Sequence, residues 1–129
     1  MQLRPYQQEV HNDCMEYLKA ANYQGPAVIN ASVGAGKSVL IAAIAKHCQD
    51  APRLKDRPVR AISIQRSGEL CSQNSEAAFA YGVNRQSIFS ASLNRKSNMY
   101  PIVFATEGTL YRALKTEFVN HPVDILMID

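Results

Sequence analysis

Apolar and polar positions follow one another along the chain in blocks that predict helices and strands in turn. The continuous apolar run Ile102-Val103-Phe104-Ala105 is typical of a buried strand, whereas Val10, Cys14 and Leu18 have the spacing of an amphipathic helix. The pattern predicts helices over residues 5–21, 36–49, 67–81 and 108–118. It predicts strands over residues 27–30, 59–64, 87–90, 102–105 and 123–128.

Continuous apolar strands that alternate with helices predict a parallel sheet covered by helices on both faces. Residues 50–58 contain two prolines and several charges, and residues 94–101 are polar, so both stretches are predicted to be loops. Gly82 follows the third helix and is expected to end it. The predicted fold class is therefore α/β, in which ligands bind beyond the carboxyl ends of the strands.

Length and composition are those of one globular domain. The chain has 129 residues, of which 47% are hydrophobic and 19% charged, and this composition argues against a disordered tail. No apolar run approaches the roughly 20 residues needed to cross a bilayer, and the amino terminus lacks the apolar stretch of a secretory signal. We expect a cytoplasmic protein with no membrane partner.

Charge and cysteine content change this picture little. The net charge of +3 permits a nucleic-acid surface without indicating one. Cys14, Cys48 and Cys71 match neither a disulfide framework nor a CxxC metal motif, and the histidines are equally scattered. We interpret the cysteines as small apolar core residues in a reducing compartment, and we do not expect a metal site built from side chains alone.

The strongest chemical signal is the segment Ala31-Ser32-Val33-Gly34-Ala35-Gly36-Lys37-Ser38, between a predicted strand and a predicted helix. This is the context of a phosphate-binding P-loop of the GxxxxGK[ST] type, with Ala31 in place of the first glycine. Glycines permit the backbone torsions that turn successive N–H groups toward phosphate oxygens. The helix that follows directs its positive end at the same anion. The segment therefore predicts a nucleotide site.

The P-loop predicts ATP and Mg²⁺ as ligands. Its cofactor-binding residues would be Ser32, Val33, Gly34, Ala35, Gly36, Lys37 and Ser38. Lys37 is placed to reach the β- and γ-phosphates, and the Ser38 hydroxyl to ligate Mg²⁺. Asp129 directly follows the apolar run 125–128 and is the candidate carboxylate for the same metal ion. Asp124, at the other end of that run, is expected to be a surface or capping residue.

These motifs, in this order, resemble the first RecA-like domain of a superfamily 2 helicase of the DEAD/DEAH type. Leu3-Arg4-Pro5-Tyr6-Gln7 resembles the adenine-recognition motif. Gln7 offers a donor and an acceptor to the edge of adenine, and the Arg4 guanidinium suits stacking on the base. An alanine such as Ala31 is common at the first position of motif I in this superfamily. Residues 125–129 resemble the start of motif II, so that Lys37 and Asp129 are the catalytic candidates.

Other segments resemble the nucleic-acid motifs of these helicases. Residues 61–70 resemble motif Ia, although Gly68 stands where a basic residue is expected and Arg66 is the substitute. Residues 89–96 resemble a loop of the RadD-type bacterial DNA repair helicases, and residues 102–110 resemble motif Ic. The resemblance assigns nucleic-acid contacts to Arg66, Ser67, Arg95, Lys96, Thr106 and Thr109. A solvated charged turn remains the alternative for Arg95 and Lys96, and Glu107 would repel a phosphate backbone.

The resemblance implies the ATP-binding half of a nucleic-acid-dependent ATPase or helicase that couples hydrolysis to unwinding or translocation. DNA is favoured over RNA, with little sequence specificity. The implied fold is a three-layer, RecA-like P-loop NTPase domain over residues 1–129, incomplete at its C-terminal end. The glutamate expected after Asp129, and a second RecA-like domain with its arginine finger, would belong to a longer parent. We therefore expect the isolated chain to be inactive or nearly so.

Three other functions share some of these features. A double-strand DNA translocase, such as a restriction or remodelling motor, would carry every motif named above. A nucleotide-binding regulatory module without motor activity would need only the P-loop. A small P-loop kinase is the third alternative, and the motif at residues 3–7 counts against it because kinases do not generally recognise adenine there.

Overall fold

The helices and strands follow one another much as the apolar pattern predicts. The computed structural model describes residues 3–19, 36–51 and 57–129. Within them the helices are α1 (Pro5–Lys19), α2 (Lys37–Asp50), α3 (Gly68–Tyr81) and α4 (Glu107–Ala113). The strands are β1 (Ala61–Gln65), β2 (Gln86–Ser90), β3 (Arg95–Lys96), β4 (Ile102–Thr106) and β5 (Ile125–Ile128). The predicted strand at residues 27–30 lies outside the described residues.

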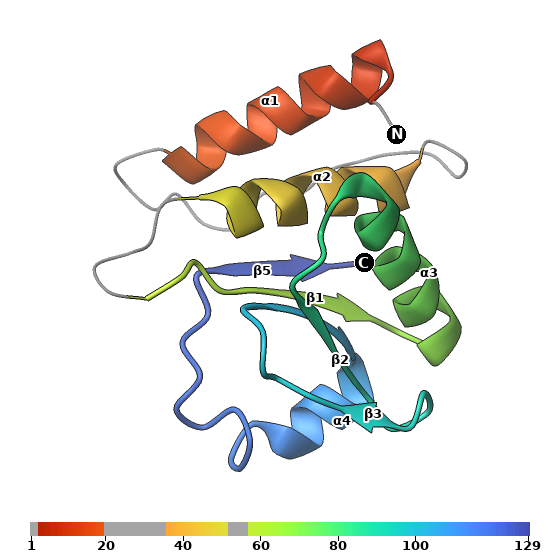
Figure 1. The fold of residues 1–129 in the computed structure, drawn as a ribbon, viewed down its shortest axis with the longest axis vertical. Helices are drawn as coiled ribbons and strands as arrows, with labels where there is room; N and C mark the ends of the chain where they lie inside the picture. Colours follow the sequence, from red (N-terminus) through yellow and green to blue (C-terminus); the bar gives the residue numbers. More distant parts are fainter. Residues whose placement is uncertain (1–2, 20–35, 52–56) are drawn as a thin grey trace.

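The strands form one sheet in the order β3-β2-β4-β1-β5. β1, β2, β4 and β5 are parallel, with Ala61 opposite both Ile102 and Ile125. The helices α3 and α4 connect parallel strands, since α3 lies between β1 and β2 and α4 between β4 and β5 in the chain (Figure 1). The α/β fold with a parallel sheet, predicted from the continuous apolar strands, is confirmed.

The short strand β3 corrects the prediction of a loop over residues 94–101. Ser90 pairs with Arg95 and Phe89 with Lys96 in an antiparallel ladder. A tight turn joins the two strands: the N–H of Asn94 donates to the carbonyl of Ala91 at 2.9 Å, and Asn94 has a φ of 57°. Asparagine tolerates this left-handed conformation better than most residues. The strand has two exposed basic residues and no apolar pattern, so hydrophobic periodicity could not reveal it.

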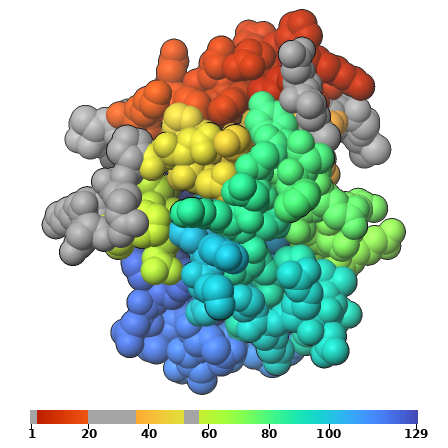
Figure 2. All heavy atoms as spheres, in the orientation of Figure 1, coloured from red at the N-terminus to blue at the C-terminus, as the bar shows by residue number. Residues whose placement is uncertain are grey.

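Helices cover both faces of the sheet. On one face α2 and α3 pack together, and their Ala45 and Cys71 belong to the same buried cluster as Phe104 of β4. On the other face Leu110 of α4 packs with Val103 of β4 and Phe89 of β2. The red-orange α1 lies outside α2 as a further helix (Figures 1 and 2). No helix within the described ranges is long and apolar enough to cross a membrane.

The fourth helix is shorter than predicted. α4 ends at Ala113, and the chain continues through successive turns in which the N–H groups of Thr116 and Phe118 both donate to the Ala113 carbonyl. These turns bring Phe118 against Phe89, with ring centroids 4.9 Å apart and the rings nearly perpendicular. Local periodicity predicts a helix that continues to residue 118. The chain leaves the helix earlier because Phe118 packs against an aromatic ring of a strand that is distant in the sequence.

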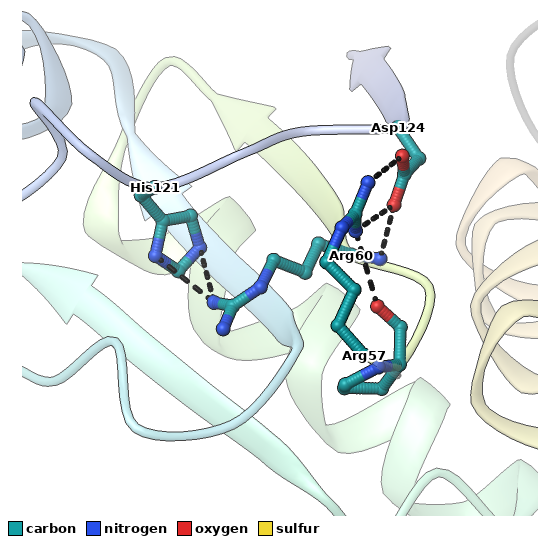
Figure 3. Close-up of polar contacts among 5 residues, drawn as sticks. Arg57, Arg60, His121 and Asp124 are labelled. Carbon is teal, nitrogen blue, oxygen red and sulfur yellow. Dashed lines mark hydrogen bonds and ion pairs between the residues drawn. The ribbon is translucent and has the colours of Figure 1, made fainter. Parts of the chain in front are cut away.

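An ion pair joins the beginnings of β1 and β5 (Figure 3). Both terminal nitrogens of Arg57 lie 2.8 Å from the carboxylate oxygens of Asp124, and the backbone N–H of Arg60 donates to the same carboxylate at 2.9 Å. Asp124 is therefore a surface residue that holds the strand register, as expected for the end of β5 opposite Asp129. Arg60 also lies within 3.2 Å of the His121 ring.

Candidate nucleotide and nucleic-acid site

The described part of the P-loop begins at Gly36, and Ser32, Val33, Gly34 and Ala35 lie outside the described residues. Gly36 has a φ of 79° and precedes the first residue of α2, Lys37. Its carbonyl accepts hydrogen bonds from the N–H groups of Val39 and Leu40. Lys37 is exposed and Ser38 is half-buried. The helix thus begins where the motif predicts, with its positive end at the lysine.

The two predicted metal ligands meet through a residue of α3. The Ser38 hydroxyl donates to Oδ1 of Asn74 at 2.7 Å, and Nδ2 of Asn74 donates to Oδ2 of Asp129 at 3.1 Å. Asn74 is 1% exposed. The arrangement of the elements brings these three residues together, since the C-terminus lies beside α3 and near the orange, N-terminal end of α2 (Figure 1). Asn74 thus joins two residues that lie 36 and 55 positions away from it in the sequence.

Strand pairing determines the position of Asp129. Its backbone N–H donates to the carbonyl of Ile64 at 3.0 Å, which continues the parallel ladder of β1 and β5 by one step. Ile125 and Met127 pack on the face covered by α2 and α3. Because side chains alternate along a strand, Asp129 belongs to that face too. The carboxylate therefore lies at the carboxyl end of the sheet, on the same face as the P-loop helix.

The donor atoms in this arrangement suit Mg²⁺. A serine hydroxyl and a carboxylate are hard oxygen ligands, which Mg²⁺ prefers, and it usually takes only one or two from protein and completes its shell with water and phosphate oxygens. No group of three or more His, Cys, Asp or Glu side chains suited to a metal ion occurs in the part of the chain that the structure describes. A Mg²⁺ ion held by Ser38 and Asp129 would take its remaining ligands from water and from nucleotide phosphates.

The predicted adenine motif packs against the P-loop. Gln7 is 3% exposed, its Oε1 accepts from the backbone N–H of Arg4 at 2.9 Å, and its Nε2 lies 3.5 Å from the Gly36 carbonyl. Arg4 stands just before α1 and Gln7 at its third position, so this bond closes the end of the helix in the manner of a capping box. Pro5, at the first helical position, suits this helix start. The predicted contacts of Arg4 and Gln7 with adenine stay a prediction.

Polar residues gather at the carboxyl ends of β1, β2 and β4. Arg66 and Ser67 follow β1 and are exposed, and the Ser67 hydroxyl accepts from the N–H of Leu70 at 3.3 Å, which caps α3. The predicted site residues Thr106 and Thr109 are buried instead. Their hydroxyls are 3.0 Å apart.

This pair of threonines links two loops. Oγ1 of Thr106 also lies within hydrogen-bonding distance of the Ser90 hydroxyl, at 3.1 Å, and Oγ1 of Thr109 accepts from the N–H of Ala91 at 3.0 Å. The two hydroxyls therefore join the end of β4 to the end of β2. Their contact with nucleic acid stays a prediction, and the described geometry gives both of them an internal structural role.

The turn between β2 and β3 lies against the start of α3. A Cβ at Gly68 would overlap the Ser92 hydroxyl, so a larger residue there requires Ser92 to move. This close approach explains why glycine stands where the helicase motif has a basic residue. Arg95 and Lys96 are exposed on β3, at the edge of the sheet. Arg66, two residues before Gly68, and Arg95, three residues after Ser92, are both exposed cations close in sequence to this contact.

Sequence reasoning missed Asn74 and the serines of the loop network. Asn74 has a recognisable signal, because Cys71, Asn74, Ser75 and Ala78 are buried and follow the i, i+3, i+4, i+7 spacing of a core-facing helix stripe. A polar residue in such a stripe needs a hydrogen-bonding partner. Ser90 has a weaker signal, as the polar last residue of a buried strand.

An apolar hollow lies elsewhere among the described residues, on the face of the sheet that carries α4. It has a volume of about 670 Å³ and its lining is almost entirely apolar, with Ile62, Leu110, Tyr111 and Leu126 among the lining residues. None of the predicted nucleotide-site residues lines it. An apolar surface of this kind does not suit a nucleotide phosphate, so the candidate site remains at Ser38, Asn74 and Asp129.

A comparison with protein families places the whole chain in one of them. The family model described as "Type III restriction enzyme, res subunit" matches residues 1–129. No curated protein matches the chain. The match agrees with the parallel sheet, with the start of α2 at Lys37 and with the position of Asp129 after β5. The chain therefore belongs to the family of the type III restriction enzyme res subunit and forms a helicase-like, RecA-like ATPase domain of superfamily 2.

Proposed function

We propose that this domain is the ATP-binding half of a motor that couples ATP hydrolysis to movement along DNA. The observation that supports it best is the meeting of Ser38 and Asp129 at the start of α2, through Asn74. In this proposal Lys37 contacts the β- and γ-phosphates, and Ser38 and Asp129 hold Mg²⁺. Bound Mg²⁺ would neutralise charge that develops on the phosphate oxygens. The N–H groups at the start of α2 orient the same phosphates.

We propose that the nucleic acid lies along the loops that follow β1 and β2. Arg66 and Arg95 are exposed there, and Lys96 extends the same edge. Such cations contact phosphates without reading bases, so binding would show little sequence specificity and would weaken with salt. DNA is favoured over RNA through the resemblance of residues 89–96 to DNA repair helicases of the RadD type.

We also propose that this domain works together with a second RecA-like domain of a longer parent protein. Leu126 and Ile128 of β5, an edge strand of the sheet, are 54% and 76% exposed. Apolar side chains at a sheet edge are normally covered, which supports a larger assembly. The residues expected to activate water and to supply an arginine finger would come from that parent, so the 129-residue chain alone would hydrolyse ATP negligibly.

The test is a substitution of the P-loop lysine in the longer protein. Lys37→Ala removes the charge proposed to bind the phosphates, so we expect DNA-stimulated ATP hydrolysis to fall by about a hundredfold or more. Lys46→Ala is the matched control, because Lys46 lies on the same helix and pairs with Asp50 at 2.8 Å, away from the site. Equal ATPase rates for Lys37→Ala and the unmodified protein would refute the assignment.

A double-strand DNA translocase is the second candidate, and the restriction-enzyme family description favours it. Both motors would share the nucleotide site proposed here. They differ in the product: a helicase releases single strands from a duplex, whereas a translocase displaces a third strand bound to intact duplex. Comparing strand separation with triplex displacement by the longer protein, at equal ATPase rates, distinguishes the two.

A further inference from the structure

Asn74 occupies a position that packing alone does not explain. It lies in the middle of α3, is 1% exposed, and uses both ends of its amide. The carbonyl end faces Ser38 at 2.7 Å and the amino end faces Asp129 at 3.1 Å. Any hydrogen-bonding groups would satisfy the amide of an asparagine that only fills the core. The two groups that bond Asn74 are instead the side chains assigned to the metal ion.

The direction of each hydrogen bond follows from the chemistry of the groups. An amide oxygen only accepts and an amide nitrogen only donates. Ser38 must therefore point its single hydroxyl proton at Asn74, which leaves the oxygen lone pairs for a cation. Asp129 accepts a hydrogen bond from Nδ2 of Asn74, which fixes the orientation of its carboxylate. One side chain thus orients both oxygen ligands and leaves lone pairs on each of them for a divalent cation.

We propose that Asn74 is a positioning residue of the magnesium site, which holds Ser38 and Asp129 in the geometry and hydrogen-bonding state that Mg²⁺ requires. This inference rests on the nucleotide site proposed above. Asn74 itself does not contact the metal ion or the phosphates. Its contribution is preorganisation, since neighbours that orient metal ligands typically change metal affinity by 10- to 100-fold.

The experiment measures binding of a fluorescent ATP analogue to the 129-residue chain across a Mg²⁺ titration and in EDTA. Asn74→Leu keeps a similar volume and removes both hydrogen bonds, and Asn74→Ala covers the case in which leucine does not fit. We expect both to raise the Mg²⁺ concentration for half-maximal enhancement of binding by about 10- to 100-fold. Affinity in EDTA, which depends on Lys37 and backbone groups, should change less than about threefold.

Two further variants distinguish a failure of the proposed nucleotide site from a failure of the positioning role of Asn74. Ser75→Ala is the matched control, because Ser75 is the adjacent buried polar residue of α3 and bonds Gln86 instead of the site. This variant should require the same Mg²⁺ concentration as the unmodified protein for half-maximal enhancement of binding. Lys37→Ala should weaken binding in both Mg²⁺ and EDTA, and its failure to do so would overturn the proposed function. If Lys37→Ala weakens binding but the Asn74 variants keep the unmodified Mg²⁺ requirement, or lose affinity equally in EDTA, the positioning role is wrong.

Discussion

Gly36 combines two constraints that no other residue type satisfies. Its φ of 79° lies in the left-handed region, and a Cβ at this position would overlap Nε2 of Gln7. The glycine therefore permits both the turn into α2 and the close approach of α1. A sequence motif requires glycine here for the phosphate loop, and the structure adds the packing of the first helix as a second reason.

Gly36→Ala should impair both folding and nucleotide binding. The left-handed conformation and the displaced Gln7 should lower the free energy of unfolding by about 1–3 kcal/mol, measured by urea titration. Affinity for the ATP analogue should fall as well, because the strain lies next to Lys37.

Gly82→Ala is the control for backbone strain alone. Gly82 has a φ of 111° and ends α3, where its Cβ would contact the side chain of Lys46 at 3.1 Å. A comparable loss of stability with unchanged nucleotide affinity is expected for this variant. If the two variants lose nucleotide affinity to the same extent, the loss reflects general destabilisation and Gly36 has no special place at the site.

The sequence alone predicts the positions of residues that are determined by their neighbours in the chain. The start of α2 at Lys37 and the place of Asp129 after an apolar strand follow from local patterns, and the structure agrees with both. Asn74 could not be predicted in the same way, because its partners lie 36 and 55 positions away. Which polar residues meet depends on how α2, α3 and β5 pack.

The third helix shows which element boundaries can be predicted from the sequence. Ser67 caps its start, and at its end the N–H of Gly82 donates to Phe79 and that of Val83 to Ala78, the pattern of a Schellman motif. These signals are local, and the predicted bounds of 67–81 agree with the helix to within one residue. The end of α4 and the strand β3 were predicted wrongly, because each depends on contacts with β2.

The ion pair between Arg57 and Asp124 makes the stability of β5 depend on pH. The hydrogen bonds from Arg57 lower the pKa of the Asp124 carboxyl below its usual value of 3.8. Because the pKa is lower in the folded state, the stabilisation is complete above the unfolded value and is lost as the pH falls through the folded value. The strand pairing of β1 with β5 is therefore expected to weaken in acid.

Asp124→Asn should lower the free energy of unfolding by about 1 kcal/mol near pH 7. The difference between the variant and the unmodified protein should shrink as the pH falls below 3.8. Urea titrations at several pH values measure it. Asp50→Asn is the control, since it removes the exposed Lys46–Asp50 pair and should cost less than about 0.5 kcal/mol. A constant difference at all pH values would contradict the role of the Asp124 charge.

The two faces of the sheet differ across the whole molecule. α2 and α3 bury one face, with Cys48 and Cys71 inside, so that burial raises the pKa of each thiol to about 11. The other face carries only the short α4 and the turns that follow it among the described residues. The core prediction for these two cysteines is confirmed, while Cys14 is only half-buried. The uneven cover leaves the apolar hollow beside β5.

This hollow should bind the apolar ring system of a fluorescent dye in the native protein. An exposed, contiguous apolar surface is unusual for a folded domain, and Leu126 lines it with 54% of its surface exposed. Leu126→Ser should reduce the fluorescence of bound anilinonaphthalene sulfonate by at least about twofold, with little loss of stability because the side chain is already largely in water.

Met99→Ser supplies the comparison for the dye experiment. Met99 is 79% exposed and does not line the hollow, so its substitution should leave the dye signal unchanged. Isolated exposed apolar side chains do not form a dye site, whereas the walls around Leu126 enclose one. If both substitutions reduce the signal equally, the dye reports scattered apolar contacts, and the hollow has no particular affinity for an apolar partner.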